Sequence, residues 1–151
     1  MGQTVKSRAE VPVQETWDLS LIYADEAAFQ HDVSEMQALT ADIATRFQGH
    51  LSQPEAICEC LRIYQQVLQL MYLTSAYSSL QVEADRYDRA ALECSARIGN
   101  ICTDIGSRLS FIESELSEQP EELLRQAMAG TDSAKGYLAE ILRNKPHRLQ
   151  P

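Results

Sequence analysis

Apolar residues recur at helical spacing through most of this chain. The first series follows Asp25, a residue type favoured at the N-cap of a helix, and Gly49 closes it. Its apolar positions step by three or four residues, with one double step: Phe29, Val33, Met36, Ile43 and Phe47. One apolar face of this kind predicts an amphipathic helix between Asp25 and Gly49.

The next segment is apolar on two sides. Ser52 and Glu55 have the spacing of a capping box, which predicts a helix that starts at Ser52 and runs to about Glu83. One side carries Ile57, Leu61, Tyr64, Leu68 and Met71, and the other carries Cys60, Ile63, Val67, Leu70 and Tyr77. A helix that is apolar on two sides is usually central in its domain, and we expect that position here.

A third long series follows a polar turn at residues 85–88. It has a seven-residue rhythm and predicts one continuous helix: Ala91, Cys94, Ile98, Ile101, Ile105, Ile112 and Leu116. We expect this helix to pack against the preceding one as a long antiparallel hairpin. Gly99 and Gly106 stand seven residues apart in it, which is consistent with a close helix crossing, a hinge or two tolerated glycines, and a close crossing is favoured.

Two short helices are expected next. Pro120 opens the first, and Gly130 closes it at a position that favours a left-handed residue. The second carries Tyr137 and Ile141 and stops at Pro146. The predicted fold class is therefore all-α, a helical bundle built from a long antiparallel hairpin with additional packed helices.

The start of the chain lacks helical periodicity. Residues 1–9 are expected to form an N-terminal tail, and residues 10–151 a single helical domain. Pro12 holds its neighbour in an extended conformation, which predicts an extended N-terminal arm. Trp17 is the expected anchor of this arm on the helices, so Trp17→Ala is expected to cost about 3 to 5 kcal/mol.

Charge and composition exclude several kinds of partner. The chain has 13 basic and 22 acidic residues, a net charge of -9 that repels nucleic acid and anionic membrane surfaces. No stretch approaches the length of a membrane span and no secretory signal is seen, so a cytoplasmic location is expected. The four cysteines, Cys58, Cys60, Cys94 and Cys102, fall within predicted helices and are expected to be reduced thiols. Burial of Cys94 and Cys102 on the isoleucine face would make their alkylation slow.

The candidate chemical groups predict no catalytic, cofactor-binding or metal site. His31 and Glu35 are four residues apart with Asp32 between them, so a metal could be gripped there, but a solvated polar face is favoured. Cys58 and Cys60 point in divergent directions on a helix and cannot share a tetrahedral ion well. The tyrosines at helical spacing are expected at the rim of the core with their hydroxyls in water: Tyr64, Tyr72, Tyr77 and Tyr87.

Three stretches carry a family resemblance: Glu10-Val-Pro-Val13, Thr16-Trp-Asp-Leu-Ser20 with Tyr23, and Lys145-Pro-His147. Together with the number and length of the helices between them, they resemble the amino-terminal region of oligoendopeptidase F in the thimet-oligopeptidase clan. After His147, the ending Arg148-Leu-Gln-Pro151 departs from that pattern.

The resemblance implies a zinc peptidase whose metal site lies further along the longer chain. In that family, an H-E-x-x-H helix supplies two histidine ligands and the glutamate that activates water, and a later glutamate is a further ligand. The histidines here are His31, His50 and His147, and none has a partner four residues away. No catalytic residue of the family can therefore be carried over, and zinc belongs to the implied full-length enzyme.

The resemblance also implies a role. These helices would form part of the wall of a deep peptide-binding cleft that admits short peptides, and their partner would be the catalytic domain of the same polypeptide. The isolated segment would then expose apolar surface and could form a homodimer through it. The alternatives are a stand-alone helical protein-interaction module and, disfavoured because no catalytic residues group by spacing, a small cofactor-free enzyme.

Overall fold

The computed structural model describes residues 10–12 and 15–145, and within them all regular structure is helical. The elements are a 3-10 helix η3 (Leu19–Leu21) and the α-helices α1 (Glu26–Phe47), α2 (Pro54–Ala84), α3 (Arg89–Leu109), α4 (Phe111–Glu118), α5 (Glu121–Ala129) and α6 (Lys135–Asn144). The predicted all-α fold is confirmed. No helix in the described part of the chain is both long enough and apolar enough to cross a lipid bilayer.

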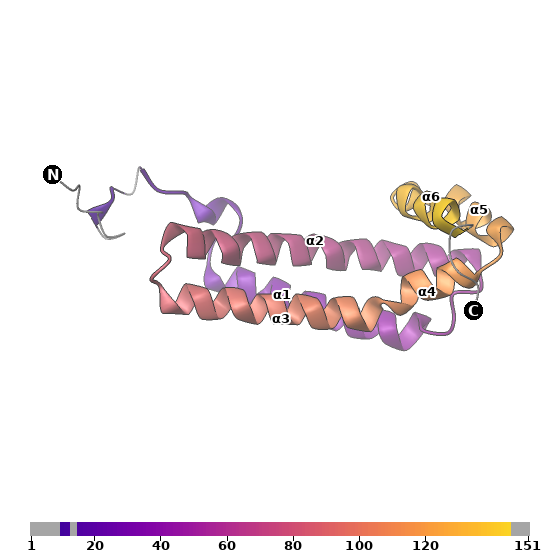
Figure 1. Ribbon diagram of the computed structural model, residues 1–151, viewed down its shortest axis with the longest axis horizontal. Helices are drawn as coiled ribbons and strands as arrows, with labels where there is room; N and C mark the ends of the chain where they lie inside the picture. The colour runs from indigo at the N-terminus through magenta and orange to yellow at the C-terminus, as the bar shows by residue number, and fades with distance from the viewer. Residues whose placement is uncertain (1–9, 13–14, 146–151) are drawn as a thin grey trace.

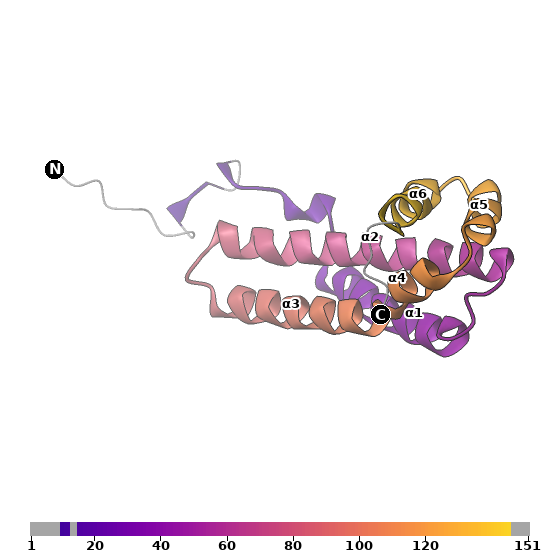
Figure 2. The same cartoon turned by 45° about the vertical axis from the view of Figure 1, so that its right-hand side comes forward.

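Helix α2 is the centre of the molecule. It packs against α1, α3, α5 and η3, which confirms the position predicted from its two apolar sides. Figure 1 shows α2 and α3 side by side as a long antiparallel hairpin, with α1 behind them. Figure 2 shows α5 and α6 over one end of α2 and the N-terminal arm near its other end.

Helix α1 begins and ends where the sequence predicts. The Asp25 carboxylate accepts a hydrogen bond from the backbone N–H of Ala28 at 2.8 Å, which satisfies a free donor of the first turn. At the other end, Gly49 has φ of 78°, a left-handed conformation that glycine adopts without steric cost. The Gly49 N–H donates to Glu115 Oε1 of α4 at 2.6 Å, so this turn also holds α4 in place.

The predicted capping box is wrong. Helix α2 begins at Pro54, and its N-cap is Gln53, which makes no side-chain capping bond. Proline suits the first helical position, because its missing N–H would lack a partner there and its φ is already helical. Pro54 rather than Ser52 therefore defines the start of the helix.

The third predicted helix is two helices. Ser110 separates α3 from α4, and its hydroxyl donates to the carbonyl oxygen of Ser107 at 2.9 Å. Serine side chains compete for helical carbonyl groups in this way. The change of direction seen in Figure 1 brings α4 against α6, where Ile112 and Leu116 are buried.

The two short C-terminal helices are confirmed, but Gly130 is not left-handed. Its φ of -87° and ψ of -5° are open to other residues, so the requirement for glycine is steric. A Cβ at Gly130 would lie 3.3 Å from Cys58 Sγ. Lys145 Nζ donates to the carbonyl oxygens of Ser117 and Gln119 at 2.6 and 2.7 Å, which ties the end of α6 to the end of α4. Pro146, His147 and the rest of the C-terminal stretch lie outside the described residues.

Tyr23, not Trp17, joins the arm to the core. The Tyr23 ring is buried. Its centroid lies 5.4 Å from the centroid of the Phe29 ring and 5.1 Å from that of the Tyr77 ring, and both pairs pack edge to face. Trp17 is 59% exposed, so the predicted anchor is wrong. Asp18 accepts hydrogen bonds from the backbone N–H and the hydroxyl of Ser20, which forms the η3 turn that leads the chain to Tyr23. The predicted tail at residues 1–9 and residues 13–14 of the arm lie outside the described residues.

Two other expectations about α2 and α3 need correction. A Cβ added at Gly99 or Gly106 would meet no atom within 4 Å, so neither glycine marks a close helix crossing within this chain. Tyr72 and Tyr87 are exposed and Tyr64 is half-buried, but Tyr77 is buried in the aromatic cluster rather than at the rim. Cys94 and Cys102 are half-buried.

Candidate functional site

One cleft lies between the start of α2 and the segment that joins α5 to α6. Its volume is about 470 Å³, and these residues line it: Pro54, Glu55, Cys58, Glu59, Arg62, Gln126, Gly130, Thr131 and Ser133. The Gln65 side-chain amide donates to the carbonyl oxygen of Ser133 at 2.6 Å and holds the joining segment against α2. The cleft thus has a cysteine and charged groups of both signs, but no histidine.

The thiol in this cleft is poorly suited to nucleophilic chemistry. Cys58 Sγ donates to the carbonyl oxygen of Ala127 at 3.3 Å, and burial followed by the nearby Glu55 carboxylate raises the pKa of the thiol. Cys60 is fully buried, and burial is the main cause that raises its pKa to about 12. Because the thiolate is the reactive form and the metal ligand, both cysteines serve packing.

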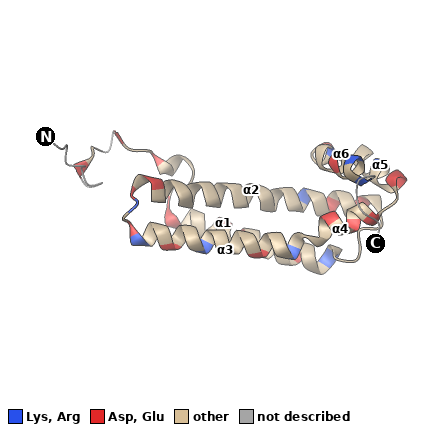
Figure 3. Ribbon diagram, viewed as in Figure 1, with Lys and Arg blue, Asp and Glu red and all other residues tan. Residues whose placement is uncertain are grey.

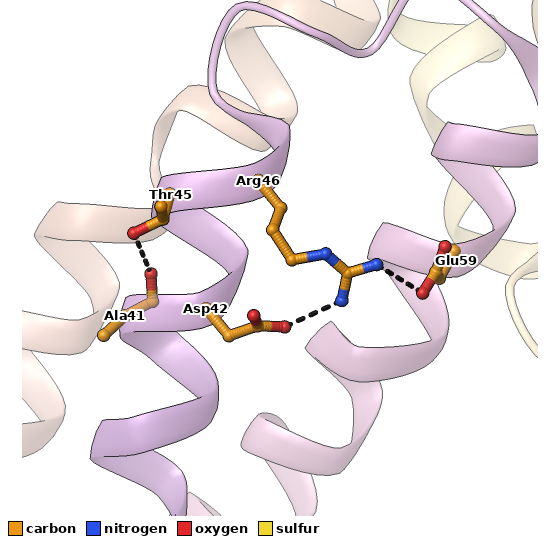
Figure 4. Close-up of polar contacts among 5 residues, drawn as sticks. All are labelled: Ala41, Asp42, Thr45, Arg46 and Glu59. Atoms are coloured by element: carbon orange, nitrogen blue, oxygen red, sulfur yellow. Dashed lines mark hydrogen bonds and ion pairs between the residues drawn. The ribbon is translucent and has the colours of Figure 1, made fainter.

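Arg46 joins α1 to α2 beside this cleft (Figure 4). Its guanidinium donates to Asp42 Oδ2 on its own helix at 2.9 Å and to Glu59 Oε1 on α2 at 2.5 Å. The hydrogen bond to Glu59, and then the one to Asp42, raises the pKa of Arg46. The guanidinium also lies 4.7 Å from the centroid of the Phe47 ring. These contacts satisfy the charge, so Arg46 has a structural role.

A second cleft of about 450 Å³ lies where the α2–α3 turn meets η3. These residues line it: Leu19, Glu26, Gln81, Ala84, Asp85, Asp88, Ala90, Ala91 and Cys94. Its aspartates act as caps, since Asp88 accepts from the N–H groups of Ala90 and Ala91 and Asp85 accepts from that of Tyr87. These carboxylates therefore form the turn and the start of α3.

The His31 cluster is gathered on the surface of α1. Single ligand atoms of His31, Asp32 and Glu35 all lie within 4.8 Å of one another, and His31 Nε2 is 3.5 Å from Glu35 Oε2. The His31 and Glu35 side chains are 75% and 47% exposed, as expected for a solvated polar face. Asp32 Oδ2 accepts a hydrogen bond from the Tyr23 hydroxyl at 2.8 Å, which commits one oxygen to holding the arm.

The zinc site of the resembled family does not fit the residues of this chain. That site needs two histidines four residues apart on one helix. His31 and His50 lie at opposite ends of α1 and both are exposed, while His147 is outside the described residues. The paired histidines of that zinc site are therefore not supplied by this sequence.

The feature that pattern reading missed is an open face on the α2–α3 pair. Leu68, Tyr72 and Ser79 of α2 are exposed, and so are Ala96, Gly99, Thr103 and Gly106 of α3. Among the described residues, no helix lies in front of this part of α2 and α3 in Figure 1. The sequence signal was present, since residues 63–82 of α2 contain no charged residue.

Comparison with known proteins gives one relative and one solved structure of note. Oligopeptidase PepF of Bacillus subtilis (strain 168) is 21% identical over 146 residues, covering 94% of this chain and 22% of the relative. A crystal structure from Chlamydophila abortus, described as a "putative peptidase", has a TM-score of 0.80 and 21% identity, covering 98% of this chain and 26% of that chain. These matches support a relationship with peptidases. No family model matches the sequence.

Both matched proteins are much longer than this chain. The chain spans 22% of the length of the relative and 26% of the solved structure, whereas almost all of its own length is matched. The shared fold is thus the whole helical unit and not a part of it. The chain is a peptidase-related helical domain.

Proposed function

We propose that this chain is the non-catalytic N-terminal helical domain of an oligoendopeptidase F-type zinc metallopeptidase. The observation that carries the proposal is the unequal coverage, 94% of this chain against 22% of oligopeptidase PepF. The three resemblance stretches support a position at the amino-terminal end of such an enzyme. The zinc and the cytoplasmic location belong to the longer enzyme and form part of the proposal.

The proposed role is to form part of the wall of the peptide-binding cleft. A rigid wall suits a helical unit whose own clefts carry structural contacts, such as the Arg46 bridge and the Asp88 cap. The catalytic domain of the same polypeptide would be the partner, and short peptides would be the substrates of the whole enzyme. This chain by itself should hydrolyse no peptide.

The first test is to read the genomic DNA onward from the codon for Pro151. We expect an H-E-x-x-H motif in the same reading frame. A stop codon directly after Pro151 would contradict the proposal for this molecule. The alternative would then be a stand-alone protein-interaction module, which the open α2–α3 face favours.

The second test concerns the wall itself. This chain replaces the matching segment of Bacillus subtilis oligopeptidase PepF, and zinc content, thermal unfolding and peptide cleavage are measured. We expect a folded, zinc-loaded hybrid that cleaves short peptides and spares an unfolded protein. A folded hybrid with zinc that cleaves both substrates equally would show that the helices do not limit substrate size. The same enzyme without the segment is the control.

A further inference from the structure

The open face of α2 and α3 is uncharged in a strongly acidic protein. The chain has a net charge of -9, yet residues 63–82 include no charged residue, and α2 in Figure 3 is uncoloured along its middle. At 100° per residue, Leu68, Tyr72 and Ser79 project from one side of α2. Between residues 63 and 82, therefore, no acidic residue lies on this side of α2.

The same side of α3 carries small residues. Ala96, Gly99, Thr103, Gly106 and Ser110 alternate at steps of three and four, the spacing of a helix-packing seam. Of the charged residues of α3, Glu93, Arg97, Asp104 and Arg108 are rotated by about 100° or more from the seam, whereas Arg89 lies near it at the first turn of the helix. Gly99 and Gly106 lower helix stability by about 0.5 to 1 kcal/mol each, and no contact within the described chain requires them.

The α2 part and the α3 part of this face differ in surface shape. Tyr72 is 74% exposed and Leu68 is also exposed, so α2 presents a ridge. A Cβ at Gly99 or Gly106 would meet open space, so α3 presents a shallow groove. A ridge beside a groove can pair with its own copy, because a two-fold axis along the bundle places each ridge over the other copy's groove.

The positions of these residues along the helix axes fit a pairing of each ridge with the other copy's groove. Ser75 Oγ and Cys102 Sγ are 3.5 Å apart, so residues 75 and 102 lie at the same height in the antiparallel pair. Stepping along both helices puts Tyr72 level with Ile105 and Ser79 level with Ile98. A two-fold axis parallel to the helices leaves each residue at the same position along the bundle. Tyr72 of the second copy therefore reaches Gly106, and its Ser79 reaches Gly99.

We propose that this face is a self-association surface on which a second copy of the chain docks, with α2 of each copy over α3 of the other. The uncharged part of α2 is about 30 Å long and two helices are about 20 Å wide. The docked pair would bury about 1,200 Å² in total, at the lower limit for a specific interface. Because an interface near this limit can be weak, its test has to reach micromolar concentrations and above. This inference does not depend on the proposed peptidase role.

Sedimentation equilibrium from about 1 µM to about 100 µM tests the proposal over the affinity range expected for such an interface. The wild-type chain should pass from monomer to dimer. Gly106→Glu should weaken the dimer about tenfold or more, because it places bulk and a like charge in the groove. Arg108→Gln makes the same change of net charge on the opposite side of α3, where Arg108 is exposed, and should leave the dimer unchanged. Thermal unfolding of each monomer at low concentration checks that both variants fold.

The outcomes separate the other occupants of the face. A wild-type chain that stays monomeric at about 100 µM overturns the proposal and leaves the face to the rest of a longer oligopeptidase. Equal weakening by Gly106→Glu and Arg108→Gln overturns it as well, since the contact would then depend on net charge. The register has its own test, in which an oxidised mixture of Tyr72→Cys and Gly106→Cys chains is digested for mass spectrometry. A 72–106 link between chains supports the register, and links at unrelated positions contradict it.

Discussion

The two sides of the α2–α3 pair carry similar uncharged residues but differ in what covers them. On one side, Val67 and Ile98 are buried in the core that α1 closes. On the other side, Tyr72 and Gly106 are exposed. The difference shows that helix composition reveals which side can be buried, while burial depends on whether a partner is present.

Removal of a buried ring on the closed side should have the largest effect. Phe29 is fully buried and packs against Tyr23 and Tyr77, so Phe29→Ala should lower the free energy of unfolding by about 3 to 5 kcal/mol. Tyr72→Ala on the open side is the matched control and should change it by less than about 0.5 kcal/mol. Urea unfolding at low concentration measures both. Equal losses would mean that the open side is packed in the monomer.

Glycine-to-alanine substitutions should have opposite effects at a strained turn and on the open face. Gly49→Ala should destabilise the chain by about 1 to 2 kcal/mol, because its φ of 78° is strained for a residue with a Cβ. Gly99→Ala should stabilise the monomer by about 0.5 to 1 kcal/mol, because alanine favours a helix and the added Cβ meets open space. Thermal unfolding of the two variants at low concentration checks the opposite signs. A loss at Gly99 would indicate a contact that the open face does not show.

A smaller effect is expected where the arm joins the closed core. Tyr23→Phe removes the hydrogen bond to Asp32 and should cost about 0.5 to 1.5 kcal/mol at neutral pH. Burial, followed by this hydrogen bond, raises the pKa of Tyr23 above its ordinary value of 10.0. The folded state then holds this proton more tightly than the unfolded state, so the stabilisation is present below pH 10.0 and is lost as pH rises above it. Urea unfolding between neutral pH and pH 11 should show the wild-type advantage shrinking, and a constant difference would argue against this linkage.

The elements could be predicted because their signals are local. Asp25 and Gly49 bound α1 through properties of single residues, and the apolar period of α2 made it central. The break at Ser110 depends instead on α4 finding a place against α6, and the seven-residue rhythm continues through it. Gly130 was read as a conformational signal, whereas its neighbour Cys58 lies 72 positions earlier in the sequence.

The candidate site was less accessible to prediction. The absence of a paired histidine motif is visible in the sequence, but the clefts combine segments far apart in the chain, such as Cys58 with Ala127. The open face was hidden for a different reason. Leu68 has the same helical period as buried Leu61 and half-buried Tyr64, and only the positions of the neighbouring helices decide which of them is covered.

The smallest change in the free energy of unfolding should come from Trp17, the residue that the sequence predicted as the anchor of the arm. Trp17 is a large aromatic residue in an otherwise polar arm, which favours the role of an anchor, yet its side chain is 59% exposed. Trp17→Ala should therefore change the free energy of unfolding by less than about 0.5 kcal/mol, well below the cost of Tyr23→Phe. Urea unfolding followed by circular dichroism makes the comparison, because the variant lacks the tryptophan fluorescence. A loss of several kcal/mol would mean that Trp17 packs against the helices in solution, and the arm would then belong to the closed side of the molecule.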